Sequence, residues 1–141
     1  IIKVNSEHPI KYINIIKQDR GKNNPPRWWY FFAIPDENVI PKDKSIEIKS
    51  IRNKSVPVFG KVESVKWEPN DNSKNLAKIF SEDKDINSLS FKLGNIKVQS
   101  LHDNFSGFSI ELEFKIKEKK LDLDSWQSLN IIARHCLEIK S

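Results

Sequence analysis

Alternating apolar and polar positions recur along the chain and predict strands. From Phe108 to Ile116, every second residue is apolar, and the residues between them are Ser, Glu or Lys. Successive side chains of a strand point to opposite faces, so this pattern predicts a strand with one buried and one solvated face. Residues 45–51 alternate in the same way, and residues 11–16 predict another strand.

A different pattern covers residues 28–34, Trp-Trp-Tyr-Phe-Phe-Ala-Ile, where bulky apolar residues occupy both parities. Such a run predicts a central strand covered on both faces. The preceding segment, residues 18–27, contains one Gly, two Asn and two Pro, which favour a loop.

Two turns are predicted between further strands. Gly94-Asn95 lies between the alternating segments Leu89–Leu93 and Ile96–Val98, and this spacing is typical of a β-hairpin. Residues 52–55 predict a turn that leads back through residues 56–67. The apolar parity changes within that segment, so we expect a bulge after Gly60.

Residues 124–139 predict an amphipathic helix, with Asp124 as the N-cap and Gln127 three residues later. At 100° per residue, the apolar side chains fall in one arc, and we expect that arc to pack on the sheet. Its members are Trp126, Leu129, Ile132, Ala133, Cys136 and Leu137. A shorter helix is predicted over residues 73–80, with Ser73 as the N-cap, before a charged loop through Asp85.

These elements predict an α+β fold with a mainly antiparallel sheet of about five to seven strands, covered on one face by the C-terminal helix. The chain has 141 residues and contains no internal repeat or Gly/Ser/Pro-rich linker, so we expect a single domain over residues 1–141.

Composition narrows the class of protein. Cys136 is the only cysteine, which excludes a disulfide within the chain, and no apolar run approaches the roughly 20 residues of a membrane span. We therefore expect a soluble, cytoplasmic protein. His8, His102 and His135 lie far apart without a metal-ligand spacing, so neither a metal site nor a cofactor is indicated.

Charge is distributed unevenly: residues 1–60 hold 11 Lys and Arg against 6 Asp and Glu, within a chain of net charge +5. The candidate binding residues are Arg20, Lys22, Arg27 and Trp28, because a basic loop leading into aromatic residues can hold an acidic partner. The leading hypothesis is a non-catalytic binding or assembly module that uses the loop 17–28. The alternative hypothesis is that the same residues bind single-stranded nucleic acid.

Catalysis is the third hypothesis and the enzyme class is not favoured. His102 and Asp103 lie in a predicted loop between strands, where the carboxylate could orient the imidazole of a small hydrolase or transferase. His135 and Cys136 are adjacent on a helix, so their side chains diverge by about 100° and cannot share a proton directly.

A homodimer is compatible with a sheet whose outer strands must be covered or paired with another subunit.

Overall fold

The computed structural model describes residues 1–24, 26–38, 40–54, 62–114 and 121–139. Within them, the strands form one seven-stranded antiparallel sheet in the order β1-β2-β3-β7-β6-β4-β5. The strands are β1 (Ile2–Lys3), β2 (Tyr12–Gln18), β3 (Arg27–Pro35), β4 (Glu47–Lys54), β5 (Val62–Pro69), β6 (Ile96–Leu101) and β7 (Gly107–Phe114).

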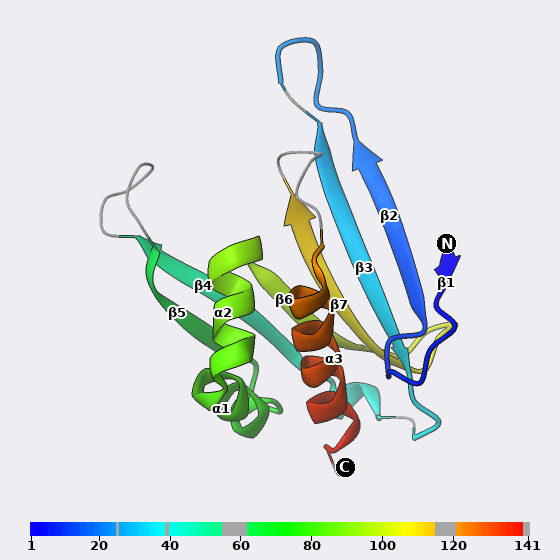
Figure 1. Cartoon of the computed structure of the whole chain (residues 1–141). Helices are drawn as coiled ribbons and strands as arrows, with labels where there is room; N and C mark the ends of the chain where they lie inside the picture. Colours follow the sequence, from blue (N-terminus) through cyan, green and yellow to red (C-terminus); the bar gives the residue numbers. More distant parts are fainter. Residues whose placement is uncertain (25, 39, 55–61, 115–120, 140–141) are drawn as a thin grey trace.

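Helices α1 (Lys74–Glu82), α2 (Lys84–Leu93) and α3 (Leu123–Leu137) cover one face of this sheet (Figure 1). A short 3-10 turn, η1 (Lys42–Lys44), precedes β4. The predicted α+β class is therefore confirmed, including the antiparallel sheet and the C-terminal helix. None of the helices in the described ranges is long and apolar enough to cross a membrane.

The core lies between the helices and the central strands. Phe32 and Ile34 of β3 and Ile110 and Leu112 of β7 are fully buried there. On the other face, Trp29 and Phe31 are only half-buried. The prediction that β3 is covered on both faces is wrong, because the described helices all pack on one side and leave an open face.

The predicted hairpin over residues 89–98 is also wrong in its first half. Residues 89–93 belong to α2, which buries Ile86, Leu89 and Leu93 and leaves Phe91 exposed. Gly94 ends this helix with φ at 115°, a conformation that glycine adopts without strain. Gly-Asn therefore stops a helix here, and the expected strand begins only at Ile96.

Ser73 is the N-cap of α1 as predicted, although its hydroxyl hydrogen-bonds to Asn70 and the Glu47 carbonyl and makes no side-chain cap bond. The prediction of a charged loop through Asp85 is wrong, because α2 already begins at Lys84. Asp83 is already the N-cap of α2, and its carboxylate accepts hydrogen bonds from the backbone N–H groups of Asp85 and Ile86.

The N-cap of helix α3 lies two residues earlier than predicted, and the helix ends at Leu137 instead of Ile139. Its N-cap is Asp122, whose carboxylate accepts from the Ser125 N–H at 2.9 Å, while Asp124 lies in the first turn. Leu129, Ile132, Ala133 and Cys136 of the predicted arc are fully buried. The other two members differ: Trp126 is partly buried against the core, and Leu137 is 37% exposed at the last turn.

The turn predicted at residues 52–55 is wrong for its first three residues. Arg52, Asn53 and Lys54 extend β4 and pair with β5, with a register shift between Asn53 and Lys54. Residues 55–61, including the predicted bulge after Gly60, lie outside the described residues, as do residues 115–116 of the predicted strand 108–116.

Candidate functional site

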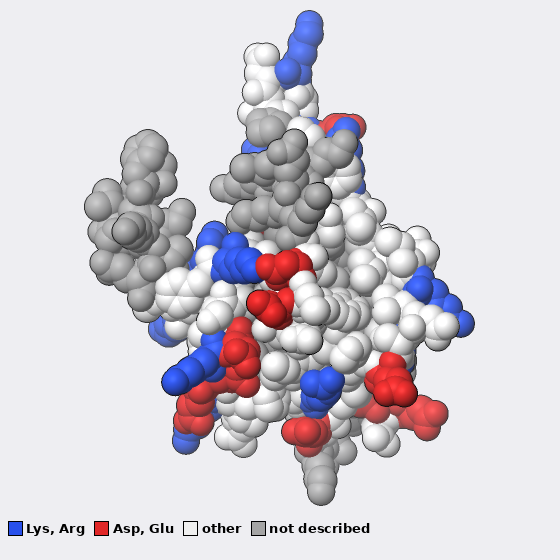
Figure 2. Space-filling model, viewed as in Figure 1, with Lys and Arg blue, Asp and Glu red and all other residues white. Residues whose placement is uncertain are grey.

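The hairpin formed by β2 and β3 projects beyond the helices that cover the sheet (Figure 1). All seven residues of β2 pair with β3, from Tyr12 opposite Ala33 to Gln18 opposite Arg27. Residues 19–24 form the hairpin tip. Figure 2 shows basic side chains at this far end. The predicted binding loop therefore connects two antiparallel strands that pair along their whole length.

Arg27 and Trp28 point to opposite faces of the sheet because they are neighbours on one strand. Trp28 lies on the helix-bearing face, where it packs against the core. Arg27 lies on the open face, where a guanidinium nitrogen is 3.0 Å from a carboxylate oxygen of Glu113 on β7. The four predicted binding residues therefore do not form one surface.

The ring of Trp28 is already in contact with a cation. The Lys17 ammonium lies 5.7 Å from its centroid, in cation–π range, and also 3.6 Å from a carboxylate oxygen of Asp19. The indole nitrogen of Trp28 is buried. This arrangement favours a structural role for Trp28 and leaves its face less accessible to a stacking ligand.

Arg20 and Lys22 are exposed at the hairpin tip. Among the residues that the structure describes, neither makes an ion pair with a carboxylate. Their charges therefore face solvent. Over the whole hairpin, residues 12–35, four basic residues stand against the single acidic Asp19, an excess of three within the chain's +5.

The open face of the sheet holds charges of both signs in nearly equal numbers. By register, its described basic side chains are Lys3, Arg27, Lys49, Lys66 and Lys97, and its described acidic side chains are Glu47, Glu68, Glu111 and Glu113. Lys97 is 3.2 Å from Glu47, for example. A face on which the two signs nearly cancel attracts phosphates only weakly as a whole.

A hollow of about 370 Å³ opens on this face near the start of β6. Its lining includes Trp29, Lys49, Lys97, Glu111 and Glu113. The sequence pattern placed Glu111 and Glu113 on a solvated face but gave no sign that β7 would lie beside β3. That pairing brings Glu113 opposite Trp29, and only the strand order of the fold reveals it.

His102 and Asp103 line a second hollow of about 450 Å³, together with Lys42, Ser45, Ser100 and Leu101. Asp103 pairs with Lys42 at 3.0 Å, and His102 Nε2 lies 2.9 Å from the Ser100 hydroxyl. That hydroxyl also accepts from the Ile46 N–H at 2.9 Å. His102 Nδ1 is buried without a hydrogen-bond partner in the described part of the chain. Asp103 therefore does not orient the imidazole, and Ser100 is held as a link between strands.

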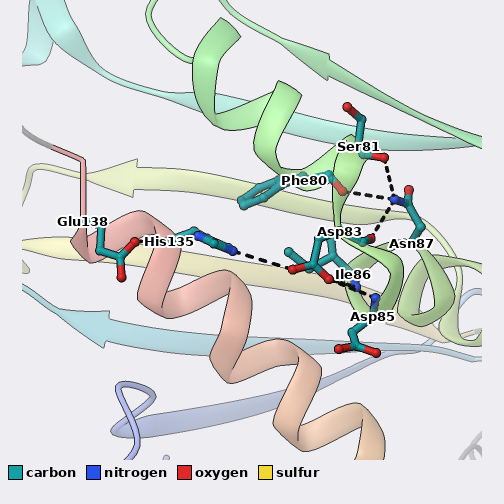
Figure 3. A network of polar contacts seen from close by, with 8 residues as sticks. All are labelled: Phe80, Ser81, Asp83, Asp85, Ile86, Asn87, His135 and Glu138. Carbon is teal, nitrogen blue, oxygen red and sulfur yellow. Dashed lines mark hydrogen bonds and ion pairs between the residues drawn. The ribbon is translucent and has the colours of Figure 1, made fainter.

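His135 belongs to a polar network at the junction of the helices (Figure 3). Its Nε2 lies 3.7 Å from Asp83, the cap of α2, and its Nδ1 lies 3.8 Å from Glu138. Asn87 completes the junction by donating to the Phe80, Ser81 and Asp83 carbonyls and accepting from the Trp67 indole at 2.9 Å. These contacts join the three helices to β5.

Cys136 is a free, fully buried thiol, and burial raises its pKa far above the ordinary value. A thiol held neutral in this way is a poor nucleophile. In the described ranges, no three His, Cys, Asp or Glu side chains gather in an arrangement that could hold a metal ion.

Comparisons with models of protein families, with curated proteins and with solved structures found no match to this chain.

Proposed function

We propose that this domain is a non-catalytic binding module that captures an acidic segment of a partner protein on its β2–β3 hairpin. The observation that carries the proposal is the concentration of exposed positive charge at the projecting tip, which makes no ion pair within the described residues. Arg20 and Lys22 are exposed there, on a hairpin with an excess of three basic residues.

Exposed charges and the apolar surface beside them both support the binding of a partner protein at this hairpin. Exposed charges at the rim of an interface mainly steer the approach of a partner and raise its association rate. The neighbouring strands supply apolar surface, because Ile16 is 45% exposed and lies opposite half-buried Trp29. Aromatic and apolar side chains within a charged rim are typical of protein interfaces.

Two contacts favour a protein over single-stranded nucleic acid. Trp28, the aromatic residue expected to stack on bases, is covered by Lys17, and Arg27 is paired with Glu113. Glu113 places a negative charge opposite Trp29, which disfavours a phosphate beside that ring. The remaining charges at the tip suit carboxylates as well as phosphates, and the experiment below separates the two.

The experiment pans a library of short random peptides on the immobilised domain and measures the affinity of the enriched peptides. We expect acidic peptides, with affinity that falls as salt rises. Replacing Arg20 and Lys22 with Gln removes two rim charges, so we expect about fivefold weaker binding or more. The charge-matched control replaces Lys74 and Lys78, which are exposed on α1, and its affinity should change less than twofold.

Enrichment of neutral or basic peptides would contradict the proposal, as would equal losses in the two double variants. A labelled oligothymidylate provides the second arm. Tighter binding of this oligonucleotide than of the acidic peptides, with the same dependence on Arg20 and Lys22, would replace the protein partner with nucleic acid.

A further inference from the structure

The outer edge of β2, Asn14–Gln18, has no neighbouring strand in the described part of the chain. The short strand β1 pairs with Tyr12 and Ile13 and covers nothing beyond them. Such an edge presents a row of backbone N–H and C=O groups to which another extended segment can pair.

Exposed apolar side chains gather at the same edge. Ile15 is 40% exposed and Ile16 is 45% exposed, on opposite faces of β2, while Ile1 and Ile2 of the adjoining segment are 93% and 53% exposed. These four account for almost half of the nine large apolar side chains that are exposed in the described ranges.

The other edge of the sheet is built differently. Lys66 and Glu68 of β5 are exposed and charged, and β5 ends at Pro69, which has no N–H to donate. Charged residues and proline are the usual means by which proteins prevent an edge strand from pairing. The β2 edge has Lys17 alone, and its ammonium lies over the Trp28 ring.

We infer that the acidic partner segment binds as an added antiparallel or parallel strand along Asn14–Gln18; this inference rests on the proposed function. Backbone hydrogen bonds would hold the segment, and its side chains would alternate between the two faces of the extended sheet. Opposite Ile15 and Ile16 the segment would place two consecutive apolar residues. Opposite Lys17 it would place an acidic residue.

Charge argues against a second copy of this chain at this edge. Antiparallel pairing of two β2 strands over Asn14–Gln18 would leave the basic tip of each hairpin without an acidic complement, because the two tips would point in opposite directions. It would also place Lys17 of each copy near the other. Like charges close to one another across a strand pair are destabilising, whereas an acidic segment complements them.

The test uses an acidic peptide selected on the domain and methylates its backbone nitrogens one residue at a time. An added strand directs alternate N–H groups toward β2, so we expect losses of about tenfold or more at every second residue and little change between them. The domain itself is unaltered, so misfolding cannot produce this period.

A matched pair of variants examines the edge from the side of the domain. Ile16→Gln removes an exposed apolar side chain from the edge without adding charge and should weaken peptide binding by about tenfold. Ile79→Gln is the control, since Ile79 is 43% exposed on α1, away from the hairpin, and the affinity of this variant should not change. Circular dichroism of both variants checks that they fold.

The outcomes separate this inference from the proposed function. Acidic peptides that depend on Arg20 and Lys22 but show no two-residue period on methylation would overturn the added strand and leave the basic binding hairpin intact. Peptides that are not acidic would overturn both. A dimer of the domain that Ile16→Gln dissociates and Ile79→Gln does not, measured by sedimentation equilibrium, would show that a second copy occupies the edge instead.

Discussion

At the scale of single residues, Gly107 shows how one position fixes a strand pair. Its φ is 147°, and a Cβ atom added there would lie 2.0 Å from the carbonyl oxygen of Ile34 on β3. Pro35 pairs with Gly107 at this end of the β3–β7 ladder. The close approach of the two strands therefore requires glycine.

Gly107→Ala is expected to destabilise the domain by about 3 kcal/mol or more, because the new methyl group meets backbone that cannot move without breaking the ladder. Urea unfolding measures the change. Gly21→Ala is the control: its φ is 97°, but nothing lies within 4 Å of the added atom. Strain alone should destabilise that variant by about 1 to 2 kcal/mol. Equal effects at the two positions would contradict this account.

At the scale of elements, the start of α3 is held by one carboxylate that serves two partners. Asp122 accepts from the Ser125 N–H and pairs with Lys92 of α2. The hydrogen bond with Lys92, followed by those with Ser125, lowers the pKa of Asp122 well below its ordinary value. The carboxylate is therefore more stable in its charged form in the folded state than in the unfolded state.

A lowered pKa in the folded state gives stability that is present above the unfolded pKa and is lost as pH falls through the folded pKa. Asp122→Asn retains an N-cap residue but removes the charge that pairs with Lys92. We expect this variant to be less stable than the wild type near neutral pH, and the difference to shrink below about pH 4. Thermal unfolding at a series of pH values measures it; a difference that stays constant into strong acid would contradict the ion pair.

Residues 84–93 show why the type of a secondary-structure element is hard to predict from apolar spacing alone. Leu89, Phe91 and Leu93 have the two-residue period of a strand, while Ile86, Leu89 and Leu93 have the spacing of a helix. The helix forms because Asp83 caps it and its buried stripe packs under α3 and β5. Phe91, the residue that made the strand pattern complete, is left exposed on the helix surface.

At the scale of the whole molecule, stability should decrease from the centre of the sheet toward the β1–β2 edge. Strands β3, β7 and β6 each have a neighbour on both sides and contribute the buried core, whereas β1 pairs through two residues. Local opening exposes edge amides more easily than those of strands paired on both sides.

Amide hydrogen exchange measures this gradient. We expect the slowest exchange in β3 and β7 and fast exchange in β1. Within Asn14–Gln18, amides that donate to β3 should be protected and the alternate, outward amides should exchange rapidly. Uniform protection across Asn14–Gln18 would contradict an uncovered edge and would remove the basis for strand addition there.

The sequence by itself determined the strands with a clear two-residue period, the buried stripe of α3 and the basic character of residues 17–28. Local spacing decides these features, because a side chain's face depends only on its position along its own element. Spacing also assigned Cys136 to the core, where the structure places it.

Tertiary structure alone decided which strands are neighbours, which face of the sheet the helices cover and which predicted site residues come together. Arg27 meets Glu113, 86 positions away along the chain, because β3 pairs with β7. Trp28 is turned to the other face, against Lys17. Contacts between distant segments depend on the packing of the whole chain, and no local pattern records them; the same packing leaves Asn14–Gln18 as an edge.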